Sequence, residues 1–373
     1  MLRNNLKIAF RLLFKQKRVS LLNVLGLAIG LTSFIFIMLW VQDELSFDRF
    51  HRNYDNIGRV VMTIGDGPDH SFDLAQTPPA LAEMLLEKFP EVHRASRFEM
   101  SSQVILSSGD KNFFEKNGAY VDPEFFGIFT FEFLQGDPTT ALSHPDNILL
   151  TERLANKYFG KSNPIGQTLT MDNHPMQITG ILKDIPSNSH IRFDFLVPIQ
   201  LKEAAGTNLD EWGDVNVNTY VLLDENTNTS SFNTKLAGLL TPRRGDRFWV
   251  QPLKRIHFTG GIAADNAVIS DIKYVYVFSF FALCILFIGC MNFINLFTAQ
   301  SIYRAKEVGV RKVIGSGKSE LRRQFFTETL VLTSISFLLA LLLIQMLLPR
   351  FAQLAGREIQ FDLTDPLMLV TLV

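Results

Sequence analysis

The chain has 373 residues, a formal net charge of −1 and 47% hydrophobic residues. Its apolar residues gather in blocks of roughly 20, and a helix of that length spans the hydrocarbon core of a bilayer, which is about 30 Å thick. These features exclude a soluble enzyme and predict an integral membrane protein with one large polar insert.

The amino end predicts a basic surface helix followed by a membrane span. In residues 1–18, apolar residues recur at helical spacing between lysines and arginines, which is typical of an amphipathic helix on the cytoplasmic membrane surface. Residues 19–41 form an apolar run that is long enough to span, and no small-residue cleavage site closes it. We therefore expect a transmembrane helix rather than a signal peptide, with Gly26, Ala28 and Gly30 allowing close helix contact.

Residues 42–273 predict an exported domain, because they are polar, relatively acidic and lie between two apolar runs. Strand-like runs such as Ile57–Ile64 and Phe248–Ile256 mix with helical runs such as Glu152–Tyr158, without strict alternation. The fold class that we expect is an α-helical membrane protein with a large α+β domain, built on a mixed or antiparallel sheet, inserted between spans 1 and 2.

The carboxyl-terminal third predicts further spans. Residues 274–298 and 325–348 are apolar runs of spanning length, and residues 349–365 read as a short outer loop. Residues 366–373 begin another apolar run, but eight residues reach only about 12 Å as a helix. We expect a fourth span that starts here, and a protein that continues beyond Val373.

Nothing in the sequence predicts a catalytic, metal or cofactor site. The seven histidines have no metal-ligand spacing, and both cysteines, Cys284 and Cys290, lie in one apolar run. Basic residues near aromatic ones, such as Arg247 beside Phe248, read as a solvated surface because the domain is exported, so no nucleic-acid partner is expected.

Residues 299–324 form a short, strongly basic segment between two spans, which predicts a cytoplasmic location for this segment and for the amino terminus. Its Gly317-Lys318-Ser319 run lacks the earlier glycine of a phosphate-binding loop, since Lys312 holds that position. The glycines instead predict a break between two helices, with Ser319 as the N-cap of the second. From spacing alone, the segment fits equally well a groove on a partner protein or an anionic lipid surface.

Glu328 falls in the first turns of the third apolar run. An ionisable group there is costly and usually faces protein or water. Two readings stay open: a pairing or functional role, and an uneventful position at a helix end.

The motifs resemble those of the MacB/FtsX-type permeases of ABC transporters, in the large form found in Bacteroidetes-like bacteria. The likeness covers nearly the whole chain and lies in the amino end, the insert and the basic segment. The matching stretches are 5–13, 23–30, 43–48, 121–126, 150–160, 164–166, 180–186 and 304–315, with Gln324 and Glu328.

This resemblance implies a permease subunit in the bacterial inner membrane, with a MacB-type core domain in the periplasm. It implies a separate cytoplasmic ABC ATPase, so that the chain itself is no enzyme. It also implies a homodimer or pseudo-dimer in contact with membrane lipid, and it allows a further partner in the periplasm or outer membrane. The residues that would couple to the ATPase, carried over by position, are Arg304, Lys306, Glu307, Gly309, Arg311, Lys312 and Gly315.

A rival interpretation from another class is a membrane-anchored sensor or adaptor. Its exported domain would bind a ligand or an envelope protein without ATP. The composition of the insert fits both interpretations, and the basic segment favours the permease.

Overall fold

A computed structural model describes residues 17–65, 71–239, 245–313 and 317–357. Within the helices, the side chains of residues 300–308, 311, 312, 318, 320 and 321 lie outside that description. The chain divides into two compact units. The helical unit is Met1–Leu45 with Ile272–Val373, and the sheet unit is Ser46–Asp271.

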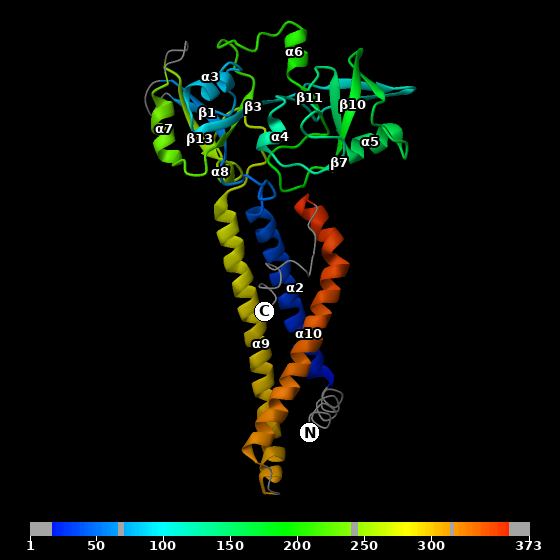
Figure 1. Cartoon of the computed structure of the whole chain (residues 1–373). Coiled ribbons are helices and arrows are strands. Elements are labelled where there is room, and N and C mark those ends of the chain that lie inside the picture. The colour runs from blue at the N-terminus through cyan, green and yellow to red at the C-terminus, as the bar shows by residue number, and fades with distance from the viewer. Residues whose placement is uncertain (1–16, 66–70, 240–244, 314–316, 358–373) are drawn as a thin grey trace. The chain divides into compact units, whose positions relative to one another are not determined.

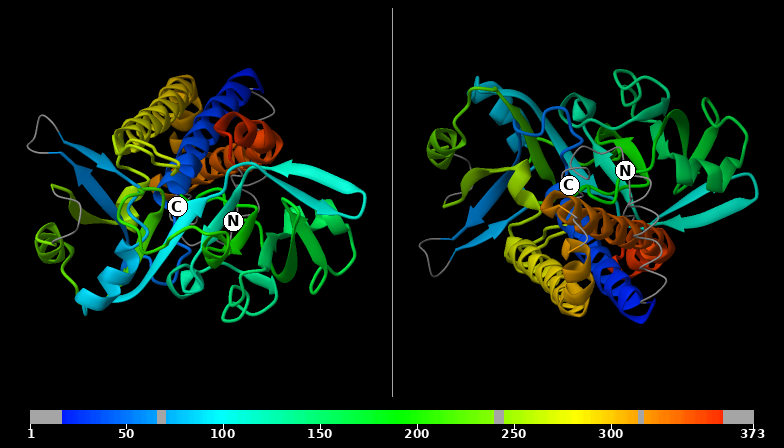
Figure 2. Two further views of the ribbon diagram at one scale, coloured as in Figure 1. Left: turned by 90° about the horizontal axis from the view of Figure 1, so that it is seen from above. Right: turned by 90° about the horizontal axis from the view of Figure 1, so that it is seen from below.

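The helical unit contains three long helices: α2 (Lys17–Leu45), α9 (Ile272–Val313) and α10 (Lys318–Ala355). Helix α2 packs against both α9 and α10, as Figures 1 and 2 show. The segments Lys17–Leu45, Ile272–Ala299 and Arg322–Ala355 are long and apolar enough to cross a membrane. Each of them contains one of the three predicted complete spans.

Two boundaries in the helical unit differ from the prediction. Helix α10 begins at Lys318 with Gly317 as its N-cap, so the predicted N-cap, Ser319, is wrong. The extended backbone of Gly317 (φ −71°, ψ 152°) makes the turn without a side-chain cap. The outer loop predicted from residue 349 also begins too early, because α10 continues through Pro349 and ends where Gly356 adopts a left-handed φ of 66°. A proline removes one backbone donor, which a long apolar helix tolerates.

The sheet unit is built on one mixed sheet of 13 strands over the described residues, with the path β13-β1-β12-β3-β6-β11-β8-β10-β9-β4-β5, β2 on β1 and β7 on β10. The strands are β1 (Ile57–Ile64), β2 (Phe72–Leu74), β3 (Val92–Met100), β4 (Val104–Ser108), β5 (Lys111–Glu115), β6 (Gly118–Val121), β7 (Phe133–Gln135), β8 (Asn147–Thr151), β9 (Thr168–Met171), β10 (His174–Leu182), β11 (Phe195–Pro198), β12 (Asn218–Leu223) and β13 (Arg247–Pro252). The helices are α3 (Leu81–Lys88), α4 (Phe125–Ile128), α5 (Glu152–Phe159), α6 (Gln200–Ala204), α7 (Thr229–Ala237) and α8 (Leu253–Ile256).

Of the two predicted alternatives, a mixed or an antiparallel sheet, the strand directions show the mixed one. Strand β11 runs parallel to β6, and β10 runs parallel to β8, while the other pairs along the path are antiparallel. The β1–β2 and β4–β5 hairpins lie at opposite ends of this unit, seen in blue and in cyan to teal in Figure 2.

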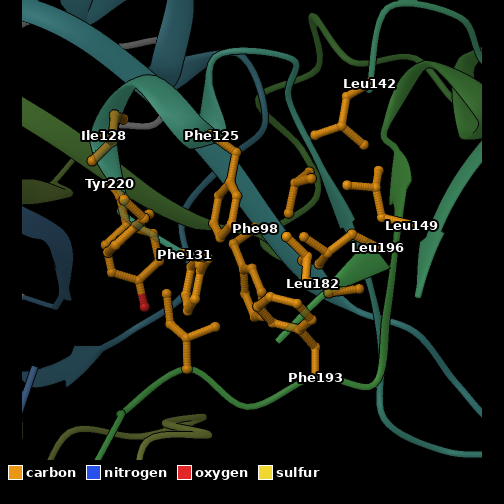
Figure 3. Close-up of a cluster of buried hydrophobic side chains, with 14 of the residues drawn as sticks. Phe98, Phe125, Ile128, Phe131, Leu142, Leu149, Leu182, Phe193, Leu196 and Tyr220 are labelled. Carbon is orange, nitrogen blue, oxygen red and sulfur yellow. The ribbon is translucent and has the colours of Figure 1, made fainter. Parts of the chain in front are cut away.

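The largest core cluster is rich in phenylalanine, and this accounts for part of the heavy use of that residue. Phe98, Phe125, Phe131 and Phe193 are buried together with aliphatic residues of β8 and β11, and the ring of Tyr220 joins them (Figure 3). Burial of one such side chain stabilises a fold by about 1.5–3 kcal/mol, so this cluster anchors the centre of the sheet.

Several segments of the sheet unit differ from the prediction, and two of them show the physical reason. The predicted strand Phe248–Ile256 is a strand only to Pro252, because this proline caps the short helix α8. Strand β3 was missed because its sequence, VHRASRFEM, carries several charged residues. One of them, Arg97, is buried against Asp122 with an Nη2–Oδ1 distance of 2.7 Å.

Candidate functional site

The predicted coupling segment has a helical backbone for most of its length. Helix α9 runs without interruption to Val313, so residues 299–313 continue the apolar helix and do not form a separate short helix. The structure describes Gly309 as exposed, and a Cβ built on it meets nothing within 4 Å. Val310 and Val313 nearby are exposed apolar side chains. The end of α9 thus presents apolar surface.

For most of the remaining predicted coupling residues, the structure describes the backbone and not the side chain. The backbones of Arg304, Lys306, Glu307, Arg311 and Lys312 are helical, while their side chains lie outside the described residues. Gly315 lies outside them altogether. The structure therefore brings no coupling side chains together that can be compared with the prediction.

Glu328 lies within α10 and its side chain is 2% exposed. It has at least one polar or electrostatic partner. The adjacent Thr327 donates a hydrogen bond from its hydroxyl to the carbonyl oxygen of Arg323, 2.8 Å away. The Glu328 carboxyl is thus buried within the helical unit, and its pairing or functional role stays a prediction.

Helices α2 and α9 contact each other at glycine residues. A Cβ built on Gly30 would lie 3.5 Å from the Cα of Gly289, and one built on Gly26 would lie 2.7 Å from Nδ2 of Asn292. Gly26 and Gly30 are four residues apart and therefore share one face of α2. Two of the three small residues that the sequence singled out, Gly26 and Gly30, thus form the contact with α9.

A charged cluster joins the ends of α2 and α10. Arg357, just after α10, lies 3.1 Å from Oδ2 of Asp43 and 2.5 Å from Oε1 of Glu44. The Glu44 side chain is 1% exposed, so its charge is buried beside the guanidinium. This cluster holds the last turn of α2 beside the end of α10.

A network of buried titratable groups lies in the sheet unit, and the spacing of its residues in the sequence does not reveal it. Asp48, three residues after α2, accepts a hydrogen bond from the backbone N–H of His190 at 3.0 Å, and its Oδ1 lies 2.8 Å from His190 Nδ1. Nε2 of His190 lies 3.0 Å from the hydroxyl of Tyr220. Burial raises the pKa of Asp48, but the charge of His190 and its hydrogen bonds outweigh burial, so this pKa is lowered.

The network continues to a buried arginine. Arg59 of β1 is 1% exposed and donates to both carboxylate oxygens of Asp265, at 2.6 and 2.7 Å. Its Nη2 also donates to Oε1 of Gln251 at 2.8 Å. Burial raises the pKa of the Asp265 carboxyl, but the hydrogen bonds and charge of Arg59 lower it further than burial raises it.

These residues come from distant parts of the sequence, which is why spacing did not reveal them. One signal was available: Arg59 is a lone charge within the apolar run Ile57–Ile64, and a buried arginine requires an acidic partner. Among the described residues, no group of three histidine, cysteine, aspartate or glutamate side chains is placed to hold a metal ion.

Two family models match the chain. The model of a MacB-like periplasmic core domain matches residues 20–239, and the model of an FtsX-like permease C-terminal domain matches residues 279–373.

Individual relatives agree with these matches. The macrolide export ATP-binding/permease protein MacB of Mannheimia succiniciproducens is 25% identical over 333 residues, which cover 86% of this chain and 49% of that protein. The ABC transporter permease YknZ of Bacillus subtilis is 22% identical over 351 residues, which cover 90% of this chain and 84% of that protein. The chain spans about half the length of its MacB relatives, at 49%, 53% and 55% for three of them.

Among solved structures, the periplasmic region of MacB from Actinobacillus actinomycetemcomitans aligns with a TM-score of 0.41 and 18% identity. The alignment covers 55% of this chain and 92% of that chain.

Proposed function

Because this chain belongs to the ABC transporter permeases that combine a MacB-like periplasmic core domain with an FtsX-like permease domain, we propose that it transmits ATP-driven motion. In this proposal a separate cytoplasmic ABC ATPase closes on ATP, and the motion passes through the membrane helices to the sheet unit in the periplasm. The work done there is the export or release of an envelope substrate.

The observation that carries this proposal is the continuity of α9. Its 42 residues span about 63 Å as a helix, twice the thickness of the hydrocarbon core. The candidate span ends at Ala299, and the helix continues to Val313 through the basic segment. A continuous helix has no joint at which an axial or rotational displacement would be absorbed, so it can act as a lever.

The contact with the ATPase is assigned to the far end of this lever. There Arg304, Lys306, Glu307, Gly309, Arg311 and Lys312 lie on the last turns of α9, and Gly315 follows in the chain. Glu307 and Arg311 are four residues apart, in the order that favours an ion pair on a helix surface. The exposed Val310 and Val313 supply the apolar area that docking into a groove requires.

We place the amino terminus and the basic segment in the cytoplasm and the sheet unit in the periplasm. The reason is that short segments rich in lysine and arginine beside membrane spans stay on the cytoplasmic side. The predicted fourth span, from residue 366, lies outside the described residues. We place the ATPase in another chain, which is supported by the 84% coverage of YknZ, a relative named as a permease alone. A dimer of this chain, or a pseudo-dimer, completes the proposal.

The test is co-purification of an ATPase with the full-length protein. The tagged protein is extracted in mild detergent from its own host, and the associated ATP hydrolysis is measured. We expect activity with the wild-type chain, and a loss of roughly tenfold or more with Glu307→Lys or Arg311→Glu, because each reversal places like charges on one helix face. Arg52→Glu, on the exposed surface of the sheet unit, is the matched control and should change nothing.

Two results would contradict the proposal. If no ATPase accompanies the wild-type chain, the sensor or adaptor interpretation takes its place. If an ATPase accompanies the wild-type chain and both reversal variants equally, the contact lies elsewhere on the permease.

A further inference from the structure

The sheet unit contains a cavity of about 240 Å³ beside the buried network. Its walls come from strands β1, β3 and β12, from the segment around His190 and from the segment Asp265–Val268. All of these residues belong to the sheet unit, so the cavity is a property of that unit alone. Cavities of this kind, with apolar walls and a few convergent polar groups, are where small ligands bind.

Three polar side chains in the wall are almost completely buried. Arg59, Tyr220 and His190 are 1%, 3% and 3% exposed. Burial of an arginine costs several kcal/mol unless its donors are used. Asp265 and Gln251 occupy Nη1 and Nη2 of Arg59, while its Nε has no hydrogen-bond partner among the described residues.

The charges in the wall favour an anion. Arg59, Arg192 and Asp265 line the cavity, and Asp265 is paired with Arg59 through both of its carboxylate oxygens. The wall therefore holds two arginines and one carboxylate, and His190, which also lines the cavity, contacts Asp48. A guanidinium matches the planar geometry of a carboxylate. Arg192 is exposed at the rim, where it donates to the carbonyl oxygen of Ser187.

The rest of the wall is apolar. Phe98 and Ile191 are buried and Met100 is half-buried, and all three line the cavity. An ion pair between Arg59 and Asp265 explains why these two residues lie together, but it does not explain an open space with an apolar side next to them. An apolar wall opposite a cationic one suits a molecule with an apolar body and one negative end.

We propose that this cavity is a binding site for a small organic carboxylate that carries an apolar or aromatic group. The carboxylate lies between Arg59 and Arg192, and the apolar group lies against Phe98, Met100 and Ile191. The occupant also contacts Asp265–Val268, the stretch that leads along the chain to α9 at Ile272. Binding itself does not depend on the proposed transport function.

The experiment uses the full-length protein in lipid nanodiscs and ¹⁹F NMR of 4-fluorophenylacetate. We expect saturable line broadening that unlabelled phenylacetate reverses. The neutral 4-fluorophenylacetamide should bind roughly tenfold more weakly, because it lacks the charge that the two arginines recognise. Empty nanodiscs serve as the control, because they measure how much of the probe partitions into lipid.

Two substitutions locate the site. Arg192→Gln removes an exposed cation without disturbing the core and should weaken binding roughly tenfold, whereas Arg52→Gln, outside the cavity, should leave it unchanged. Ala267→Phe fills the cavity from its wall and should abolish binding, with circular dichroism to check that the variant is folded.

Equal binding of the carboxylate and the amide, or unchanged binding in Arg192→Gln, would overturn the proposal. Broadening that empty nanodiscs reproduce, or no broadening at all, would also overturn it. Because no ATPase or ATP is present, these outcomes are independent of the test of the proposed function.

Discussion

Gly30 of α2 lies against Gly289 of α9, with no side chain between the two backbones: a Cβ built on Gly30 would be 3.5 Å from the Cα of Gly289. In a membrane, apolar side chains gain little by leaving lipid for a helix interface, so helices associate where small residues let their backbones approach. The position of α2 beside the lever helix α9 therefore depends on the size of residue 30.

We expect Gly30→Ile to separate α2 from α9 while Gly30→Ala leaves them together, since the Cβ of alanine makes an ordinary van der Waals contact there. The measurement is disulfide formation between Gly26→Cys and Asn292→Cys, in a chain with Cys284 and Cys290 replaced by alanine. Cross-linking should fall severalfold in Gly30→Ile. Equal cross-linking in both variants would show that residue 30 does not set the spacing.

Arg357 provides the second prediction, because it joins the ends of α2 and α10. Replacing one partner of a buried ion pair leaves an uncompensated charge and costs about 3–5 kcal/mol, and the 14% exposure of the Arg357 side chain reduces this to on the order of 2 kcal/mol. We expect Arg357→Met to lower the midpoint of thermal unfolding in detergent by several degrees.

Glu44→Gln supplies the control for the same cluster. If the two residues interact, Arg357→Met combined with Glu44→Gln should be less destabilised than the sum of the single variants. Strict additivity would mean that the pair contributes nothing beyond its members.

The sequence predicts those features of the fold that depend on local pattern. The strand Ile57–Ile64 has the predicted bounds, because a run rich in β-branched residues and bounded by turn residues carries its own signal. Strand β3 lacks that signal, because it contains several charged residues. The sheet tolerates them because partners from elsewhere in the chain, such as Asp122, pair with them. Tertiary pairing overrides local pattern there.

The residues of the candidate site also fall into those that the sequence predicts and those that only the fold brings together. Gly26, Ala28 and Gly30 are predicted to allow close helix contact because they are small residues within an apolar span, and Gly26 and Gly30 do contact α9. The Asp48–His190–Tyr220 contacts were not recognised, because the residues lie on separate segments that only the sheet topology brings together. The histidines looked scattered for the same reason.

His51 predicts how the stability of the sheet unit depends on pH. Burial lowers its pKa from 6.5 to about 4, although the nearby charge of Asp48 raises it, and His190 lowers it further. The rings of Phe50, Phe129 and Phe131 surround the imidazole.

Between pH 6.5 and 4, the unfolded chain binds the His51 proton and the folded chain does not, so the free energy of unfolding falls as the pH falls through this range. The loss from His51 alone is on the order of 3 kcal/mol, at about 1.36 kcal/mol for each tenfold change in proton affinity. Thermal unfolding of the full-length protein in detergent, followed by circular dichroism across this pH range, measures the slope.

His51→Asn should flatten that slope, because the asparagine side chain supplies an acceptor for the Thr130 N–H, which lies 3.1 Å from Nδ1 of His51, without titrating. His93→Asn is the matched control, because it makes the same replacement at a histidine that is exposed. An unchanged slope in His51→Asn would assign the pH dependence to other groups.

The proposed topology makes a prediction about labelling. In a chain with Cys284 and Cys290 replaced by alanine, a cysteine at Ser162, exposed on the sheet unit, should react with a membrane-impermeant maleimide once the outer envelope is opened. A cysteine at Ser316 should react only after the inner membrane is permeabilised. The reverse pattern would place the basic segment outside the cell.

The lever assigned to α9 makes the last prediction. Four glycines inserted after Ala299 interrupt the helix between the span and the coupling residues, and each glycine costs about 1 kcal/mol in a helix interior. The ATPase should still co-purify, because its docking surface is intact, but motion should no longer reach the periplasm. The readout is the labelling rate of a cysteine at Asn266, which ATP should change in the uninterrupted chain and leave unchanged in the insertion variant. Four glycines inserted after Gly206, in an exposed turn of the sheet unit, serve as the control and should preserve the response. If the Ala299 insertion also preserves it, force reaches the sheet unit by a route other than α9.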